Sequence, residues 1–90
     1  SGEIIGIGDV AAQTEQTLHN VLSVLAEGGA SPADVLKCTV YLKNIADFQK
    51  MNDIFSRTFG ETPPARTTVQ AHLAEPAMLV EIEAIAFVGA

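Results

Sequence analysis

The spacing of apolar residues changes along this chain from helical to alternating, then to helical and to alternating again. Apolar positions three or four apart indicate a helix with one buried face, whereas every second position indicates a strand. The pattern predicts a helix between Asp9 and Gly29, a strand over 35–43, a helix over 48–59, and strands over 66–73 and 78–88. This order, α-β-α-β-β, restricts the chain to folds in which helices cover a sheet.

The ends of both predicted helices carry residues that start or stop a helix. Asp9 and Asp47 precede the two helical stretches, where an aspartate side chain can accept a hydrogen bond from an unpaired first-turn amide. Gly28 and Gly29 follow the first helix and Gly60 follows the second, as glycine does where a chain leaves a helix through a left-handed turn.

The predicted elements form one α+β domain, 1–90, with a single sheet and both helices on one of its faces. The last two strands are joined by the short "AEPA" turn, which predicts a hairpin of adjacent strands. Within 35–43, one face carries Leu36, Cys38, Val40 and Leu42, and the other carries Val35, Lys37, Thr39 and Tyr41. The face without helices is apolar at Val35, Tyr41, Leu79, Ile85 and Phe87. We therefore expect other copies of the chain to cover it.

Charge and cysteine content exclude several classes of function. The chain has 5 basic and 11 acidic side chains in 90 residues, so we expect neither nucleic acid nor an anionic membrane as a partner. Cys38 is the only cysteine, which rules out an internal disulfide and CxxC sites, and its alternation with core positions favours a packed thiol. The sequence shows neither an apolar run of about 18 residues nor a basic leader, so we expect a cytoplasmic protein.

One arginine and two carboxylates lie in the last two predicted strands. In the expected hairpin, Arg66 and Thr68 would share a sheet face with Glu81 and Glu83, on the side without helices. The simplest interpretation is a cross-strand ion pair, which is common and contributes little. The alternative is a site in which the guanidinium binds a small carboxylate through two parallel hydrogen bonds and a glutamate orients or deprotonates water.

Other motifs are weaker candidates. His19 and His72 are not at a spacing typical of metal ligands, and we expect no bound metal. The glycines of "GEIIGIGD" lack the spacing and the preceding strand of a dinucleotide-binding loop.

Four stretches carry a family resemblance: "GDVAAQTEQTLHNV", "VLKCTVYLKNIADFQKMNDIFSRTFG", "PPARTTV" and "VEIEAIA". In order and spacing they cover nearly the whole chain, and the sequence resembles the YjgF/RidA family, also called the endoribonuclease L-PSP family. The resemblance implies a chorismate-mutase-like fold, a homotrimer and clefts between subunits. It further implies hydrolysis of reactive enamines and imines of amino acids to 2-oxo acids and ammonia without a cofactor, which removes damaging metabolites.

The resemblance also implies roles for individual residues. Arg66 matches the family arginine that binds the substrate carboxylate, and Glu81 matches the glutamate that positions the attacking water. Thr68 stands where many members have cysteine or another small residue, and its hydroxyl could donate a hydrogen bond. Phe48 and Asn52 match the region that lines the cleft from a neighbouring subunit, although Phe48 also belongs to the apolar stripe of its helix.

The chain departs from the family at its start. Members usually begin with a β-hairpin that carries a "GPYSQA"-like stretch and an "SGQ" strand end, and this sequence begins about where that hairpin ends. We therefore expect a domain that is N-terminally truncated relative to the family. The rival to the deaminase is a non-catalytic module that binds small carboxylates or other proteins, like the members described as translation inhibitors or chaperones.

Overall fold

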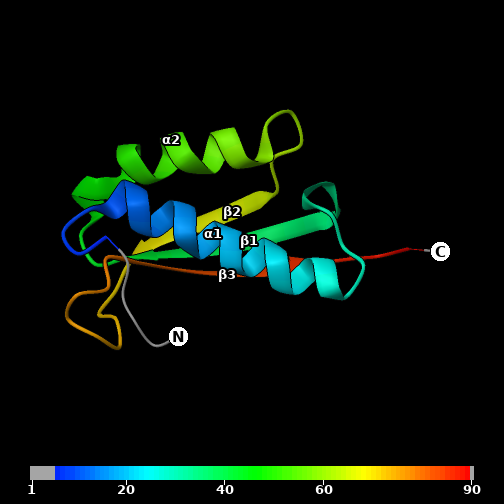
Figure 1. Cartoon of the computed structure of the whole chain (residues 1–90). Coiled ribbons are helices and arrows are strands. Elements are labelled where there is room, and N and C mark those ends of the chain that lie inside the picture. Colours follow the sequence, from blue (N-terminus) through cyan, green and yellow to red (C-terminus); the bar gives the residue numbers. More distant parts are fainter. Residues whose placement is uncertain (1–5, 90) are drawn as a thin grey trace.

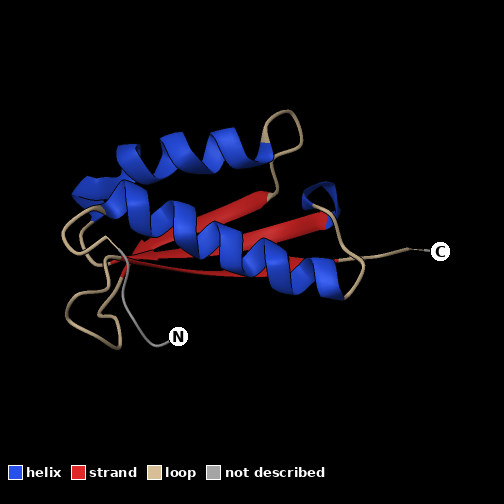
Figure 2. Ribbon diagram, in the orientation of Figure 1, coloured by secondary structure: helices blue, strands red, loops and turns tan. Residues whose placement is uncertain are grey.

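Two helices lie side by side over one face of a three-stranded sheet in the computed structural model, which describes residues 6–89 (Figures 1 and 2). The elements in chain order are α1 (Val10–Glu27), β1 (Val35–Leu42), α2 (Phe48–Phe59), β2 (Ala65–Gln70) and β3 (Val80–Ala86), with 3-10 turns at Pro32–Asp34 and Ile45–Asp47. The predicted α+β class and the placement of both helices on one face are confirmed.

The sheet has the strand order β2-β1-β3, so the predicted hairpin is wrong. β1 pairs with β2 in parallel and with β3 antiparallel, and β2 and β3 lie on its two sides (Figure 1). The segment 71–79 passes around the end of β1 instead of turning tightly. The end of β1 and the residue after it hold this segment on both sides, because Ala71 N–H donates to the Leu42 carbonyl at 2.9 Å and Lys43 N–H donates to the Leu79 carbonyl at 3.0 Å.

The start of β1 departs from simple alternation. The register with β3 shifts between Val35 and Lys37, which is the signature of a β-bulge. As a result Val35 is buried, whereas Leu36 is 58% exposed, which reverses their predicted faces. From Cys38 onward the alternation is regular, and Cys38, Val40 and Leu42 face the helices as predicted.

The core lies between the helices and this sheet face. Its buried apolar residues are Val10, Leu18, Val35, Cys38, Val40, Leu42, Met51, Ile54, Phe55, Phe59, Val80 and Ile82. Leu79, which we expected on the open face, packs against the core, as do Leu22 and Leu25 of α1. The apolar face of α2 is therefore buried at Met51, Ile54, Phe55 and Phe59, whereas Phe48 is only partly covered.

The helix ends follow the sequence with one exception. Asp9 accepts a hydrogen bond from the Ala12 amide at 3.0 Å, and Gly29 has the left-handed φ of +86°. Asp47 makes no side-chain capping bond to α2, contrary to expectation, because it ends a 3-10 turn. Asn44 caps that turn through the Ala46 amide at 3.0 Å.

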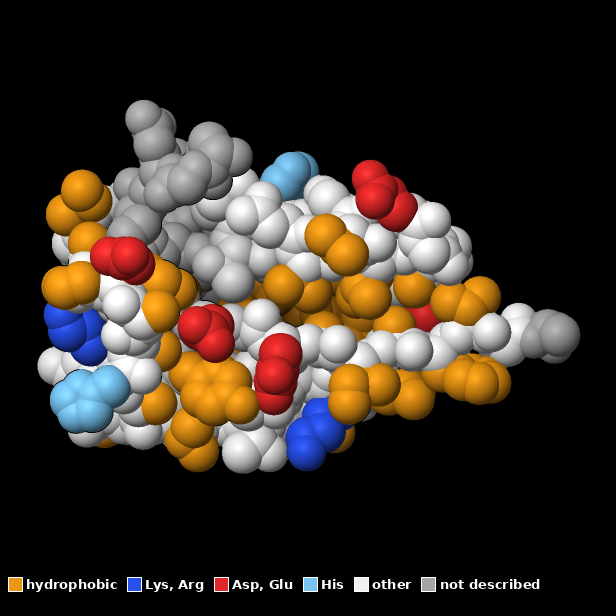
Figure 3. Space-filling view, turned by 90° about the horizontal axis from the view of Figure 1, so that it is seen from below, with side chains coloured by type: hydrophobic (Ala, Val, Ile, Leu, Met, Phe, Trp, Pro, Cys, Tyr) orange, Lys and Arg blue, Asp and Glu red, His pale blue; other side chains and the backbone are white. Residues whose placement is uncertain are grey.

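No helix from the described residues 6–89 covers the second face of the sheet (Figure 2). Ile85 and Phe87 are 64% and 65% exposed. Tyr41 lies on this face and donates a hydrogen bond to Glu83 Oε1 at 3.0 Å. Figure 3 views the molecule from below and shows apolar side chains grouped beside acidic ones on the surface.

Candidate functional site

Arg66 is held by α2, on the side of the sheet that the helices cover. It pairs in register with Cys38 of β1, a core residue, so both side chains project toward the helices. The guanidinium carbon lies 5.1 Å from the ring centroid of Phe48 and 4.7 Å from that of Phe55. Arg66 Nη1 donates a hydrogen bond to Asn52 Oδ1 at 2.6 Å. We call Phe48, Asn52 and Phe55 the arginine cradle. Phe48 and Asn52 thus contact the Arg66 of their own chain, whereas the resemblance implied that they line the cleft from a neighbouring subunit.

The cradle arises from the helical repeat. Residues four and seven positions apart return to the same face of a helix, so Phe48, Asn52 and Phe55 form one row along α2. Aromatic faces attract a planar guanidinium and limit its hydration. Asn52 is a neutral partner and takes one of five N–H donors, which leaves the positive charge of Arg66 without compensation by this contact. The arrangement can therefore present an oriented cation to a small anion.

A pocket of about 320 Å³ adjoins the cradled arginine. It is lined by Asn52, Phe55, Ser56, Gly60, Pro63, Pro64 and Arg66. Among these lining residues Arg66 is the charged one, and the remainder are apolar or neutral. The pocket thus combines one cation with a wall of mixed polar and apolar character.

Thr68 is the next residue of β2 that faces the same way as Arg66. It pairs with Val40 of β1, whose side chain is fully buried. The Thr68 hydroxyl oxygen is buried and has no hydrogen-bond partner among residues 6–89. A buried hydroxyl without a partner costs about 1–3 kcal/mol, and a ligand could offset that cost. The prediction that Arg66 and Thr68 share a face is confirmed, but this is the face that the helices cover, whereas the open face was predicted.

Glu81 and Glu83 lie on the opposite face of the sheet from Arg66, which corrects the sequence prediction. In β3, Glu81 pairs with Tyr41 and Glu83 with Thr39, and both carboxylates are exposed. The prediction assumed that β2 pairs directly with β3. With β1 between them, the residues of β3 that share the face of Arg66 are those beside the core, such as Ile82. Arg66 bonds to Asn52 and Glu83 accepts from Tyr41, so the expected cross-strand ion pair is replaced by other contacts.

The side chains of Tyr41 and Cys38, which lie near Glu83 and Arg66, have raised pKa values. The hydrogen bond to Glu83 raises the pKa of Tyr41, and burial and the negative charges of Glu83 and Glu81 act in the same direction. Burial raises the pKa of the Cys38 thiol, and the nearby charge of Arg66 opposes this more weakly. Cys38 is 1% exposed and packs in the core, as its alternation predicted.

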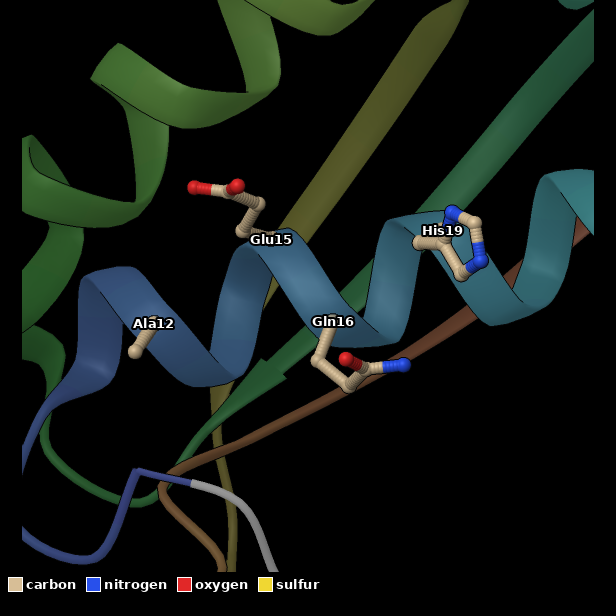
Figure 4. A pocket seen from close by; sticks show the side chains of 4 residues that line it. All are labelled: Ala12, Glu15, Gln16 and His19. Atoms are coloured by element: carbon tan, nitrogen blue, oxygen red, sulfur yellow. The ribbon is translucent and has the colours of Figure 1, made fainter.

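The remaining candidates do not converge on a site. His19 lines a surface pocket with Ala12, Glu15 and Gln16, and Figure 4 shows that all four side chains come from α1. Among residues 6–89 no group of three or more His, Cys, Asp and Glu side chains is arranged to hold a metal ion. In the same part of the chain no helix is long and apolar enough to span a membrane.

Sequence reasoning missed one residue of the cradle. Phe55 lies on the buried face of α2 and is 3% exposed, yet its ring is nearer to the guanidinium than that of Phe48. Its position seven residues after Phe48 and three after Asn52 was the available signal.

The fold and the cradled arginine define a class of small α+β proteins with two helices over a mixed sheet and a candidate anion-binding group at the sheet edge. Residues 1–88 match the family model described as Endoribonuclease L-PSP, and the chain belongs to this family. The resemblance stated from the sequence motifs is therefore confirmed.

Individual relatives support this assignment. A RutC family protein of Pyrococcus abyssi is 46% identical over 87 residues, which are 97% of this chain and 68% of the relative. The 3-aminoacrylate deaminase RutC of Acinetobacter baylyi is 34% identical over 88 residues, which are 98% of this chain and 70% of the relative. The family thus includes a deaminase.

Solved structures show the same fold. A YjgF/YER057c/UK114 family member from Mycobacterium tuberculosis superimposes with a TM-score of 0.88 at 34% identity, covering 92% of this chain and 70% of that one. The YjgF gene product of E. coli gives a TM-score of 0.84 at 36% identity, covering 96% of this chain and 68% of that one.

Proposed function

We propose that this protein hydrolyses reactive 2-enamine or 2-imino acids to 2-oxo acids and ammonia. The observation that carries the proposal is the oriented guanidinium of Arg66, whose hydrogen bond goes to a neutral amide and which adjoins a pocket. The 34% identical RutC of Acinetobacter baylyi is named as a deaminase of 3-aminoacrylate, itself a small enamine that carries a carboxylate.

In the proposed reaction the chain's own residues bind and orient the substrate. Arg66 holds the carboxylate through two parallel hydrogen bonds and so places the C=N carbon, which supplies the proximity effect. The Thr68 hydroxyl donates a hydrogen bond to the substrate, and Phe48 and Asn52 keep the guanidinium in place. Glu81 orients a water molecule that adds to the C=N carbon. The tetrahedral adduct then loses ammonia as its C–N bond breaks and a C=O bond forms.

Arg66 and Glu81 cannot meet within one chain, because the sheet separates them. We propose that the Glu81 that acts beside Arg66 belongs to a neighbouring copy in a homotrimer. The sheet face that carries Glu81 also exposes Ile85 and Phe87, and burial of this apolar surface would favour association.

Ammonia release from freshly generated 2-iminobutyrate tests the proposal. We expect turnover by the protein and its loss in Arg66→Ala, while light scattering gives an unchanged molar mass. Arg57→Ala is the matched control, because Arg57 is an exposed arginine of α2 that lies outside the pocket. Undiminished ammonia release by the Arg66→Ala protein would exclude this mechanism.

A second candidate function is binding of small carboxylates without catalysis. The separation of Glu81 from Arg66 favours it, because Arg66 bonds to the neutral Asn52 and Glu81 of the same chain lies on the other face of the sheet. Calorimetry with a 2-oxo acid distinguishes the two functions. Binding without any hydrolysis of 2-iminobutyrate supports the second.

A further inference from the structure

One buried polar side chain, that of Gln13, ties α1 to the segment that leads into β3. Gln13 lies near the start of α1 and is 6% exposed. Its Nε2 donates to the Ala77 carbonyl at 2.9 Å and to the Gly6 carbonyl at 3.2 Å, and its Oε1 accepts from the Leu79 N–H at 2.7 Å. Both amide donors and the amide oxygen therefore have partners, as a buried amide requires.

These bonds fix the backbone where β3 begins. Leu79 is held from two sides, since its N–H donates to Gln13 and its carbonyl accepts from the Lys43 N–H at 3.0 Å. β3 starts at the next residue, and Glu81 is its second residue. Among residues 6–89 β3 pairs with β1 alone, and the ends of such an edge strand open readily. The contact with Gln13 restrains this end just before Glu81.

We propose that Gln13 is a positioning residue for Glu81: through Leu79 it holds the start of β3, so that the Glu81 carboxylate keeps one direction on the open face. The inference rests on the proposed function for the role of Glu81 in orienting water. An error of about 1 Å in the placement of a reacting group can lower a rate about 100-fold, so a small shift of the strand end is sufficient. Arg66 lies on the other face and bonds to Asn52 of α2, so Gln13 should affect turnover without affecting carboxylate binding.

Gln13→Met tests the inference, because methionine has a similar length and lacks the amide donors. We expect kcat for ammonia release from 2-iminobutyrate to fall about tenfold or more, while the dissociation constant of 2-oxobutanoate by calorimetry changes less than about twofold at unchanged stoichiometry. Gln16→Met is the matched control and should keep its turnover, because the Gln16 amide donates to Asn20 within α1.

Gln13→Glu adds a pH signature. The carboxylate can still accept from the Leu79 N–H, but it can donate to the Ala77 carbonyl only when it is protonated, and burial favours protonation. Turnover of this variant relative to that of the unmodified protein should therefore rise as the pH falls. Gln16→Glu should show no such rise.

Backbone order parameters from NMR relaxation follow Glu81 without turnover. In Gln13→Met we expect the value for the Glu81 amide to fall from about 0.85 toward about 0.6, while that of Thr39 in the central strand is unchanged. Circular dichroism and light scattering verify the fold and the molar mass, and Gln13→Glu replaces the methionine variant if the latter unfolds.

Undiminished turnover in the folded Gln13→Met protein overturns the inference. A loss of 2-oxobutanoate affinity in step with turnover also overturns it, because that result indicates general damage to the structure. Failure of the proposed function is distinguishable, since the unmodified protein then releases no ammonia. In that case the order parameter of Glu81 alone decides whether Gln13 holds it in place.

Discussion

A site shared between two chains should be recovered by mixing two inactive variants. Arg66 and Glu81 project from opposite faces of the same sheet, so an active site that needs both must take one from each of two copies. Arg66→Ala destroys every carboxylate anchor, and Glu81→Gln destroys every water-orienting carboxylate. In a mixed oligomer, an Arg66 from one variant can still meet a Glu81 from the other.

The fraction of activity recovered follows from the number of chains that contribute to each site. When equal amounts of the two variants assemble at random, each site is intact if both of its contributing chains are of the right type, which gives about a quarter of the sites. The second mixture contains equal amounts of unmodified protein and of a variant that carries both Arg66→Ala and Glu81→Gln. It also leaves about a quarter of the sites intact, whereas a site within one chain would leave about half.

The assay is ammonia release after the two variants are unfolded and refolded together. The same variants refolded separately and then combined serve as the control, and they should stay inactive if subunits do not exchange. Mixed oligomers that remain inactive, while unmodified protein refolded in the same way recovers its activity, would refute a site that spans two chains.

Two further predictions concern the described contacts. Asp9→Ala should lower the free energy of unfolding by about 1 kcal/mol because the cap of α1 is lost, whereas Asp47→Ala, which removes no capping bond, should change it much less; urea denaturation measures both. Tyr41 is the only tyrosine, so ultraviolet absorbance follows its ionisation alone, and we expect a midpoint above that of free tyrosine that falls in Glu83→Gln. Since the folded protein keeps this proton longer than the unfolded chain, stability should decline as the pH rises past the ordinary pKa of tyrosine.

The helices could be predicted from the sequence because their signals are local. The apolar spacing of 48–59 and the glycine that follows it depend only on neighbours within two turns, and the predicted bounds agree with α2. Asp9 likewise acts on an amide three residues away. Asp47 failed as a cap because a 3-10 turn intervenes, and the sequence pattern of a cap does not distinguish the two kinds of turn.

The pairing of the strands could not be predicted in the same way. A strand at the centre of a sheet and one at its edge can have the same alternation, so the short turn before β3 favoured a hairpin that does not form. Every face assignment that depended on that hairpin then failed, including the shared face of Arg66 and Glu81. Arg66 and Asn52 were both identified from the family motifs, but their direct contact depends on how α2 crosses β2.

The central position of β1 has a consequence for local opening of the molecule. Within residues 6–89 both outer strands bond only to β1, so in this part of the chain neither has a sheet partner if β1 detaches. Amide hydrogens of β1 should therefore exchange with solvent only when the whole molecule unfolds, whereas β2 and β3 can each fray at the outer edge without disturbing the other.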